Sequence, residues 1–482
     1  MNYLDFDLLL ERAGRNYKAR VLNSPGGQAT IDFSFPFSEA KLANFKVNIC
    51  PPGTAADRVK SEAMKAAKRF GNDLFNAVFK GEVRACFRKS LDEADRQGAG
   101  LRLRLRLAEV PKLIDVPWEY LHDPTLNRFF SLSVATPIVR YIDIPERIRS
   151  WPIENALRIL VMIANPTDRA PLEAEREWKN LNQALKEMKH NKLVQPERLE
   201  RATWKNLQNK LRENEYHIFH FIGHGDFDER NGDSMLIFED ENNCSQPVSG
   251  HALGMLLHDE TTLRLALLNA CEGARSGRRD PFAGIAQNLV QQGIPAVIAM
   301  QFAVTDETAV TLTHKFYDAL ADGYAVDAAL AEARKAIYLD KSNIEWGTPV
   351  LYLRAPDGYI FDLMKTQLNG APWRARLVVR QGDRDGQSFP LGAGNKIIGR
   401  EPKLAVVLPD TNISRRHAQI IWRGGRYEIE DLGSTNGTFV NNAPLTGSQS
   451  LQHGDAIRVG NTVLIFKFDG EINTMADIKT TV

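Results

Sequence analysis

Short apolar runs alternate with longer charged segments through the middle of the chain, from about residue 151 to about residue 364. Residues 157–163, 217–222, 263–270 and 294–300 are apolar runs of strand length, and stretches long enough for helices separate them. Strands that are apolar at successive positions are typical of a parallel sheet with both faces covered. The pattern therefore predicts an α/β domain with a mostly parallel sheet flanked by helices.

The two ends of the chain follow other patterns. In residues 1–150, strand-like and helical stretches mix, and residues 102–107 alternate arginine with leucine. Strict alternation predicts a half-buried strand, and we interpret its arginines as a solvated face, with nucleic-acid binding as the alternative. Residues 365–376 have the composition of a linker, residues 377–468 combine short strands with Gly and Asn turns as in a β-sandwich, and residues 469–482 are expected to form a loose tail.

Composition narrows the classes of function. The chain has 482 residues, 43% hydrophobic and 25% charged, with a formal net charge of +1, as in ordinary soluble proteins. This balance provides no overall field that attracts nucleic acid or an anionic membrane. The longest apolar stretch, residues 294–304, is shorter than the ~20 residues that span a bilayer, and the N-terminus lacks the basic start and apolar core of a signal peptide. We expect a cytoplasmic protein without nucleic-acid or membrane partners.

Four cysteines stand far apart, at Cys50, Cys86, Cys244 and Cys271. No CxxC pair or dense spacing suggests a disulfide framework, so reduced thiols are expected. Cysteines and histidines do not fall at the spacing of metal ligands, and the chain has neither a GxGxxG fingerprint nor a P-loop. We therefore expect no metal and no other cofactor, which disfavours an oxidoreductase or a nucleotide-binding protein.

Two predicted strand ends carry residues suited to thiol chemistry. His224 and Gly225 follow one strand, and Cys271 follows another, at a separation of 271 − 224 = 47 residues. Sites in parallel sheets gather at the carboxyl ends of strands, and a caspase places its histidine ~50 residues before a Gln-Ala-Cys-x-Gly signature. The sequence Asn-Ala-Cys-Glu-Gly at residues 269–273 matches the Ala, Cys and Gly and departs at Glu272.

Each residue of this pair has a chemical role. Cys271 would attack as a thiolate, and His224 would hold that charge and protonate the leaving amine. The backbone N–H groups of Gly225 and Cys271 would bind the oxyanion. The alternative is a buried structural cysteine, and the His-Gly partner at this spacing favours the catalytic pair.

The front of the chain, up to about residue 364, resembles the CHAT family of caspase-like cysteine peptidases. Beside the two site motifs, the matching segments include PWEYLHDP, FFSLSVATPIVR, GIPAVIAMQFAVTDETA and WGTPVLYLR. The resemblance implies a non-catalytic N-terminal accessory lobe over residues 1–150 and a caspase-like catalytic lobe over residues 151–364. It also implies thiol-dependent peptide cleavage, often as the executing part of bacterial defence or regulated proteolysis.

The residues that would select a substrate are less defined. Metacaspase-like members of the same clan of cysteine peptidases usually carry Asp two residues before the catalytic cysteine, where it binds a basic side chain of the substrate. This chain has Asn269 at that position. That departure argues against a strict preference for Arg or Lys. Asp226, Asp228 and Asp280 are candidate acids for the pocket, or else ordinary loop residues and a helix cap.

Three motifs lie on predicted loops of the C-terminal sandwich: Ile-Gly-Arg at 398–400, Ser-Arg-Arg-His at 414–417, and Gly-Ser-Thr-Asn-Gly at 433–437. Arginine and hydroxyl groups together can satisfy the oxygens of a phosphate, and each motif alone could be ordinary turn chemistry. In this order they resemble the FHA family, which reads phosphothreonine. The resemblance implies that the phosphate is bound by Arg400, Ser414, Arg415 and Thr435, and that Asn436 holds the peptide main chain. Gly399, His417 and Gly437 would build the loops.

These features together predict a thiol-dependent endopeptidase that is directed or regulated by phosphothreonine. Its partners would be a protein substrate and a phosphothreonine-containing protein, such as a Ser/Thr kinase or its target. The alternative is a catalytically inactive caspase-like scaffold that acts as a phosphothreonine-dependent adaptor. The presence of both His224 and Cys271 favours the enzyme.

Overall fold

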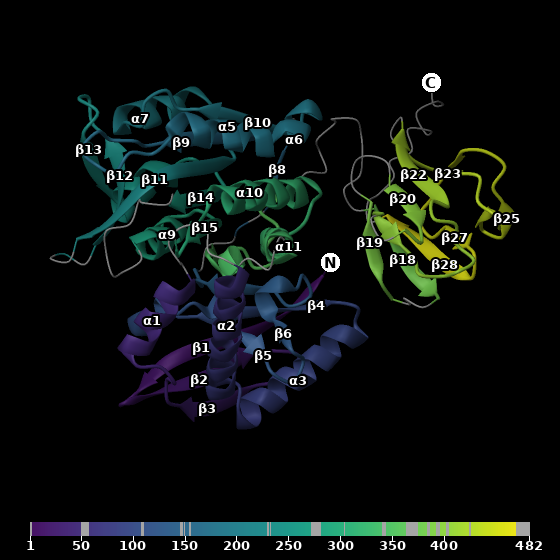
Figure 1. The fold of residues 1–482 in the computed structure, drawn as a ribbon, viewed down its shortest axis with the longest axis horizontal. Coiled ribbons are helices and arrows are strands. Elements are labelled where there is room, and N and C mark those ends of the chain that lie inside the picture. Colours follow the sequence, from purple (N-terminus) through teal and green to yellow (C-terminus); the bar gives the residue numbers. More distant parts are fainter. Residues whose placement is uncertain are drawn as a thin grey trace, which may run out of the picture. The chain divides into compact units, whose positions relative to one another are not determined.

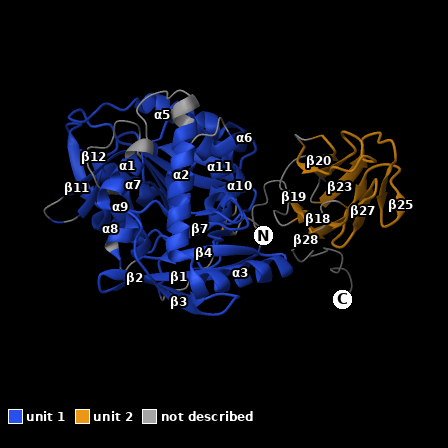
Figure 2. Cartoon of the chain, turned by 60° about the horizontal axis from the view of Figure 1, so that its bottom comes forward, with its two compact units in different colours: residues 1–151, 156–362 blue, residues 152–155, 363–482 orange. Residues whose placement is uncertain are grey.

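The computed structural model describes residues 2–49, 57–107, 110–144, 148, 150–153, 156–228, 231, 233–270, 281–302, 304–339, 344–362, 375–382, 386–391, 396–401, 404–423 and 426–468. Two of the predicted site residues, Cys271 and Asp280, lie outside this part of the chain. The chain divides into two compact units, the first of residues 1–151 and 156–362, the second of residues 152–155 and 363–482 (Figure 2).

The helices of the first unit flank its sheet (Figure 1). The α-helices are α1 (Glu39–Ile49), α2 (Asp57–Val78), α3 (Gly81–Arg96), α4 (Pro111–Ile114), α5 (Ala174–Ala184), α6 (Lys186–His190), α7 (Trp204–Glu213), α8 (Gly250–His258), α9 (Pro281–Gln291), α10 (Asp306–Ala321) and α11 (Val326–Leu339). Short 3₁₀ helices are η1 (Trp118–Tyr120), η2 (Phe130–Leu132) and η3 (Ile344–Gly347).

A single sheet runs through the first unit in the order β10-β9-β11-β14-β15-β16-β7-β4-β1-β2-β3. Its strands are β1 (Tyr3–Ala13), β2 (Asn16–Asn23), β3 (Ala29–Phe33), β4 (Gly100–Arg106), β7 (Ile138–Tyr141), β9 (Leu157–Ile163), β10 (Val194–Arg198), β11 (Ile218–Asp228), β14 (Leu265–Ala270), β15 (Ala296–Met300) and β16 (Pro349–Leu353). β12 (Asp233–Glu239) and β13 (Ser245–Ser249) extend it beside β11. Two small ribbons pair β5 (His122–Asp123) with β6 (Arg128–Phe129) and β8 (Trp151–Pro152) with β17 (Phe361–Asp362).

The centre of this sheet has the predicted arrangement. β10, β9, β11, β14 and β15 are parallel neighbours, and β16 closes the run antiparallel to β15. β16 then pairs with β7 through Tyr352 with Arg140 and Leu353 with Tyr141, so the sheet continues into the strands of the first 150 residues. The prediction of an α/β fold with a mostly parallel sheet is confirmed, and the mixed sheet with flanking helices is consistent with a caspase-like fold.

The two faces of β11 meet different helices. Phe219 and Phe221 lie on one face, in a buried apolar cluster with residues of α7, α8 and α9. His220 and Ile222 lie on the other face, where they line a cavity with residues of α5 and α10. Because both faces of the strand are covered, apolar or uncharged residues are needed at successive positions, which explains the unbroken run in the sequence.

β11 is longer than the sequence pattern predicts. The apolar run ends at Ile222, but the strand continues to Asp228 and pairs there with β12 in antiparallel register, His224 opposite Ile237 and Phe227 opposite Ser234. β12 in turn pairs with β13. The later half of β11 therefore leaves the parallel sheet and forms a three-stranded ribbon, in which one side can be polar.

The arginines of β4 are not a solvated face. Arg102 is 1% and Arg104 is 7% exposed, and both pair with acidic residues of the adjacent parallel strand β1. Arg104 contacts Asp5 at 2.7 Å and Asp7 at 2.8 Å, and Arg102 reaches Asp327 of α11 at 2.5 Å. The interpretation as a solvated basic face was wrong because the compensating carboxylates come from distant parts of the chain.

The second unit is the predicted β-sandwich. Its strands are β18 (Ala375–Gln381), β19 (Ser388–Pro390), β20 (Lys396–Gly399), β21 (Val406–Val407), β22 (Ala418–Arg423), β23 (Arg426–Asp431), β24 (Thr438–Val440), β25 (Ala443–Pro444), β26 (Gln449–Ser450), β27 (Ala456–Val459) and β28 (Thr462–Phe468). They form two sheets, β19-β18-β28-β27-β24-β25 and β21-β20-β22-β23-β26. Alternate residues of both sheets, such as Leu377, Ile420 and Leu464, build one buried core.

Candidate functional site

His224 lies where β11 leaves the parallel sheet, beside the end of β14. In this pair of parallel strands, Ile222 is opposite Asn269 and Gly223 is opposite Ala270. His224 and Cys271 are the next residues of the two chain segments. The prediction that these two strand ends are neighbours in one sheet is confirmed. Cys271 lies outside the described residues, so its distance from His224 stays a prediction.

The His224 side chain is 4% exposed, and its Nε2 lies 2.9 Å from the carbonyl oxygen of Ala170. A carbonyl oxygen can only accept a hydrogen bond, so Nε2 carries a proton and donates it. Ala170 belongs to the loop between β9 and α5, which follows the carboxyl end of the strand next to β11. The sequence does not reveal this contact, because a residue of any type supplies a backbone carbonyl.

The loop that carries Ala170 is attached through side chains to β11 and to the first residue of β13. Arg169 Nη2 lies 3.0 Å from Asp226 Oδ2, and its Nε donates to Ser245 Oγ at 3.2 Å. Ser245 donates from its backbone N–H and its Oγ to Asp168 Oδ1, at 2.8 and 2.7 Å. The hydrogen bonds from Ser245 lower the pKa of Asp168 below its usual range. We call Asp168, Arg169, Asp226 and Ser245 the loop clamp.

Three other predicted site residues lie on β11 or next to it in the sheet. Gly225 is buried and opposite Leu236 of β12. Asp228 ends β11, where its Oδ2 accepts a hydrogen bond from Asn231 at 2.8 Å. Asn269 is 5% exposed on β14, on the sheet face of Ile222. The structure thus brings His224, Gly225 and Asn269 to one region of the sheet, whereas Asp226 faces Arg169.

Asn269 lines a small cavity of mixed polar and apolar residues from β11, β14, α5 and α10. The cavity has about 10 Å³ and is lined by Glu177, Asn180, Leu181, His220, Ile222, Asn269, Ala309, Val310 and Thr313. Asn269 Oδ1 and His220 Nε2 are buried there without a hydrogen-bond partner among the described residues. This volume is about that of one water molecule. Burial lowers the pKa of His220 to about 3, so this imidazole is neutral at physiological pH.

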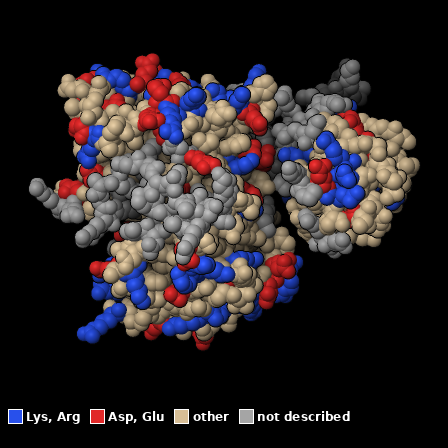
Figure 3. Space-filling model, viewed as in Figure 1, with Lys and Arg blue, Asp and Glu red and all other residues tan. Residues whose placement is uncertain are grey.

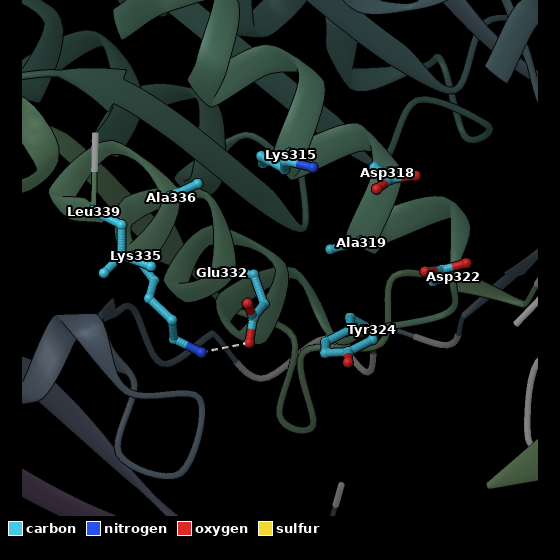
Figure 4. A pocket seen from close by; sticks show the side chains of 9 residues that line it. All are labelled: Lys315, Asp318, Ala319, Asp322, Tyr324, Glu332, Lys335, Ala336 and Leu339. Carbon is cyan, nitrogen blue, oxygen red and sulfur yellow. Dashed lines mark hydrogen bonds and ion pairs between the residues drawn. The ribbon is translucent and has the colours of Figure 1, made fainter. Parts of the chain in front are cut away.

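A larger groove of about 300 Å³ lies elsewhere, between α10 and α11 (Figure 4). Its lining mixes Lys315 and Lys335 with Asp318, Asp322 and Glu332, and Lys335 contacts Glu332 at 2.7 Å. None of the predicted site residues lines it. Because its lining holds no cysteine or histidine, its size does not make it the candidate site for thiol chemistry.

The predicted phosphate-binding residues of the second unit come together at one end of the sandwich. Arg400 N donates to the carbonyl oxygen of Ser414 at 3.2 Å, Ser414 Oγ lies 3.4 Å from Thr435 Oγ1, and Thr435 N donates to Ser414 Oγ at 3.1 Å. Within the described loops, the exposed side chains of Arg400 and Arg415 form no ion pair. Arginines without an ion pair, on loops that also carry two adjacent hydroxyls, are suited to bind a phosphate.

The buried imidazole of His417 connects these loops. Its Nδ1 accepts from Ser414 N at 3.1 Å, and its Nε2 faces the carbonyl oxygen of Gly437 at 3.2 Å. Such a bridge needs a neutral ring, because one nitrogen accepts while the other donates. Burial lowers the pKa of His417, although the hydrogen bond to Gly437 acts in the opposite direction.

Gly399 and Asn436 complete the same loops. A Cβ at Gly399 would lie 2.2 Å from the carbonyl oxygen of Arg415, so only glycine fits there. Asn436 Nδ2 donates to the carbonyl oxygen of Asn412 at 2.8 Å, which ties its loop to the loop of Ser414.

Basic and acidic side chains are interspersed over the face of the first unit in Figure 3, so no field of one sign covers it. Among the helices that the structure describes, none is long and apolar enough to cross a bilayer. In the same described part, no three His, Cys, Asp or Glu side chains gather as a metal site needs.

Family models match both parts of the chain, and the curated relatives match about a fifth of it. The CHAT domain model matches residues 68–388, and the FHA domain model matches residues 396–460. The Oxoglutarate dehydrogenase inhibitor of Corynebacterium efficiens is 42% identical over 92 residues, 19% of this chain and 64% of that protein. The FHA domain-containing protein FhaA of Mycobacterium tuberculosis is 46% identical over 85 residues, 18% and 16% of the two chains. The chain thus spans less than two thirds of the length of these relatives.

Solved structures match a similar share of the chain. One, from a structural and functional analysis of phosphothreonine-dependent FHA domain interactions, is 40% identical and covers 20% of this chain and 98% of its own, with a TM-score of 0.19. Another, the FHA domain of FhaA in complex with an intracellular domain, is 42% identical over 19% of this chain and 99% of its own, with a TM-score of 0.18.

Proposed function

Because the chain belongs to the CHAT domain family and carries an FHA domain after the CHAT region, we propose that it is a thiol-dependent endopeptidase directed to its substrates by phosphothreonine. The CHAT region has a protease-like fold, and the FHA domain is a module for phosphothreonine-dependent binding in signalling.

The proposed reaction begins at Cys271. Its thiolate attacks the carbonyl carbon of the scissile peptide bond, and the backbone N–H groups of Gly225 and Cys271 bind the oxygen that gains charge. As the C–N bond breaks, His224 gives a proton to the leaving amine, and a thioester remains on Cys271. Water then attacks the thioester while His224 takes up its proton, which releases the new carboxyl terminus and restores the thiolate–imidazolium pair.

The observation that carries this proposal is the register of β11 and β14. Gly223 lies opposite Ala270, so His224 and Cys271 each follow a paired residue on adjacent parallel strands. Such strands lie about 4.8 Å apart, which is within reach of an imidazole and a thiol. The hydrogen bond from His224 Nε2 to Ala170 supports the same role, because it fixes the ring and assigns proton exchange with the thiol to Nδ1.

The FHA domain would supply the choice of partner. Arg400, Ser414, Arg415 and Thr435 are the proposed phosphate ligands, and Asn436 would hold the peptide main chain. The partner would be a phosphothreonine-containing protein, such as a Ser/Thr kinase or its target. Binding it would raise the local concentration of substrate at the peptidase site without a change in that site.

Cleavage profiling with a peptide library tests the proposal, with wild-type protein beside Cys271→Ala. Cleavage by the wild type that the substitution abolishes would support the endopeptidase and reveal its preferred residue before the cleaved bond. Phosphopeptide binding without any cleavage would instead favour a phosphothreonine-dependent adaptor with an inactive caspase-like part. Cys244→Ala is the matched control, because Cys244 lies on the β12–β13 turn.

A further inference from the structure

We propose that the loop clamp positions His224 for catalysis by holding the Ala170 carbonyl against its ring. This inference rests on the proposed peptidase function and adds Asp168, Arg169, Asp226 and Ser245 to it as positioning residues. None of them needs to touch the substrate. Their effect passes through one backbone carbonyl.

The position of that carbonyl depends on the conformation of a surface loop. Asn165 closes the base of the loop, because its side chain accepts from Leu172 N at 2.8 Å and donates to Leu172 O at 2.9 Å. Pro171 follows Ala170 and disfavours a helical conformation of the Ala170 backbone. The base and the backbone of the loop are thus restricted, and the clamp fixes where its outer part lies.

Two residues of the clamp, Asp168 and Arg169, belong to the loop and directly precede Ala170. Arg169 bridges Asp226 at 3.0 Å and Ser245 at 3.2 Å, and Asp168 accepts both hydrogen bonds of Ser245. Thr167 adds a backbone hydrogen bond to the carbonyl oxygen of Asn243 at 2.8 Å. A shift of Arg169 therefore displaces the adjoining carbonyl, and a displaced carbonyl loses the aligned 2.9 Å contact with His224.

Asp226 lies two residues after His224 on β11. Side chains two apart on a strand share one face, so the strand that presents the imidazole also presents the carboxylate that holds the loop. This arrangement couples the position of the loop directly to the position of His224. It also gives Asp226 a role that differs from the substrate-pocket prediction, because its carboxylate faces Arg169 of this chain.

The clamp should matter more for His224 than for the stability of the fold. The side chains of Arg169 and Asp226 are 32% and 31% exposed, and ion pairs with that exposure contribute little to the stability of a protein. A substitution in the clamp should therefore leave unfolding nearly unchanged. Such a substitution should instead change the reactivity of the Cys271 thiol, which the proposed mechanism pairs with His224.

Iodoacetamide alkylation of Cys271 tests this inference without a known substrate. The full-length wild type, Asp226→Asn and the control Asp233→Asn are compared across pH, and mass spectrometry follows the peptide that contains Cys271. Asp233 is an exposed carboxylate on the neighbouring strand β12, outside the clamp. We expect Asp226→Asn to move the alkylation midpoint upward, toward the ordinary thiol value of about 8.5. Asp233→Asn should match the wild type.

Two further measurements separate positioning from general structure. For cleavage, Asp226→Asn should lower kcat about three- to fivefold and leave KM unchanged. About 1 M salt should bring the wild type toward the variant, because salt screens an exposed ion pair. The paired reversal Arg169→Asp with Asp226→Arg should recover part of the loss that each single reversal causes.

The possible outcomes distinguish the inference from the proposed function. If Asp226→Asn alkylates like Asp233→Asn, the clamp does not position His224. If Asp226→Asn instead raises KM only for peptides with Arg or Lys before the cleaved bond, Asp226 belongs to the substrate pocket and the inference is overturned. A wild type that neither cleaves nor has a reactive Cys271 would contradict the peptidase proposal.

An NMR measurement keeps the inference testable in an inactive protein. In a Cys271→Ala background with ¹⁵N-labelled histidine, the Nε2 resonance of His224 should report a protonated, hydrogen-bonded nitrogen. Adding Asp226→Asn should shift that resonance toward a mixture of the two tautomers. Identical His224 resonances in both proteins would contradict the positioning role, whatever the activity.

Discussion

Arg102 and Asp327 form a buried ion pair between β4 and α11, 225 residues apart in the chain, with Nε and Oδ2 at 2.5 Å. Both side chains are at most 2% exposed. Arg102 also donates to the carbonyl oxygens of Pro356 and Asp357. One guanidinium thus connects three distant segments of the first unit.

Asp327→Ala should destabilise the first unit by about 3–5 kcal/mol, because it leaves the charge of Arg102 buried without its closest partner. Urea unfolding measures this difference in free energy. Glu332→Ala is the control on the same helix, since its pair with Lys335 is more than one third exposed and should contribute at most about 1 kcal/mol. Equal, small effects of the two substitutions would contradict the prediction.

Sequence patterns predicted the centre of this unit well and its polar contacts poorly. The bounds of β9 coincide with the apolar run at residues 157–163, because a strand buried on both faces requires such a run. The end of β11 was wrong by six residues, since its later half is held by antiparallel pairing with β12, which alternation in one segment does not reveal. The arginines of β4 were misassigned because Asp5 and Asp7 lie almost one hundred residues earlier.

Cys271→Ala and His224→Ala should each abolish peptide cleavage, because nucleophile and base act as one unit. Far-UV circular dichroism and thermal unfolding should show that both variants keep the fold. The thiol control Cys244→Ala should cleave at the wild-type rate. Wild-type cleavage by Cys271→Ala protein would show that another residue is the nucleophile.

Arg400→Ala should weaken phosphothreonine-peptide binding by about tenfold or more, because a charged hydrogen bond to phosphate contributes roughly 1.5–3 kcal/mol. Isothermal titration of the full-length protein measures the affinity. Arg416→Ala is the matched control, since Arg416 is exposed on the same loop but is not among the proposed ligands. Equal losses from the two substitutions would indicate general electrostatic attraction rather than a defined phosphate site.

The same Arg400→Ala substitution should separate two kinds of substrate. Cleavage of a partner protein that carries the phosphothreonine should slow, because the tether is lost, while cleavage of a short free peptide should continue at the wild-type rate. Initial rates on the two substrates, measured side by side, test this. A similar loss on both would assign the FHA domain a structural role in the peptidase.

A fall in pH should lower the stability of the phosphate-binding loops, because His417 becomes protonated. Its pKa is lowered by burial, so the unfolded chain takes up a proton near pH 6.5 before the folded chain does. The stability that the neutral ring provides is therefore complete above about pH 6.5 and decreases as the pH falls below it. Pulse proteolysis in urea at several pH values, with the fragments of residues 375–468 identified by mass spectrometry, measures this decrease.

His417→Asn is the comparison for that measurement. The variant should be less stable than the wild type at pH 7.5, and the difference between them should shrink toward pH 5.5. Other titrating groups act in both proteins, so the difference isolates His417. A difference that stays constant over this range would mean that the ring does not titrate with folding.

The contact between His224 and the carbonyl of Ala170 has a consequence for how variation at this site is recognised. Every amino acid has a carbonyl, so replacing Ala170 by another residue keeps the hydrogen-bond acceptor that His224 uses. A scan of single substitutions could therefore pass over position 170 as tolerant. Deleting or inserting one residue between Asn165 and Leu172 would move a different carbonyl, or none, toward the imidazole. At this position the length of the loop is the property under constraint, rather than the identity of its side chain.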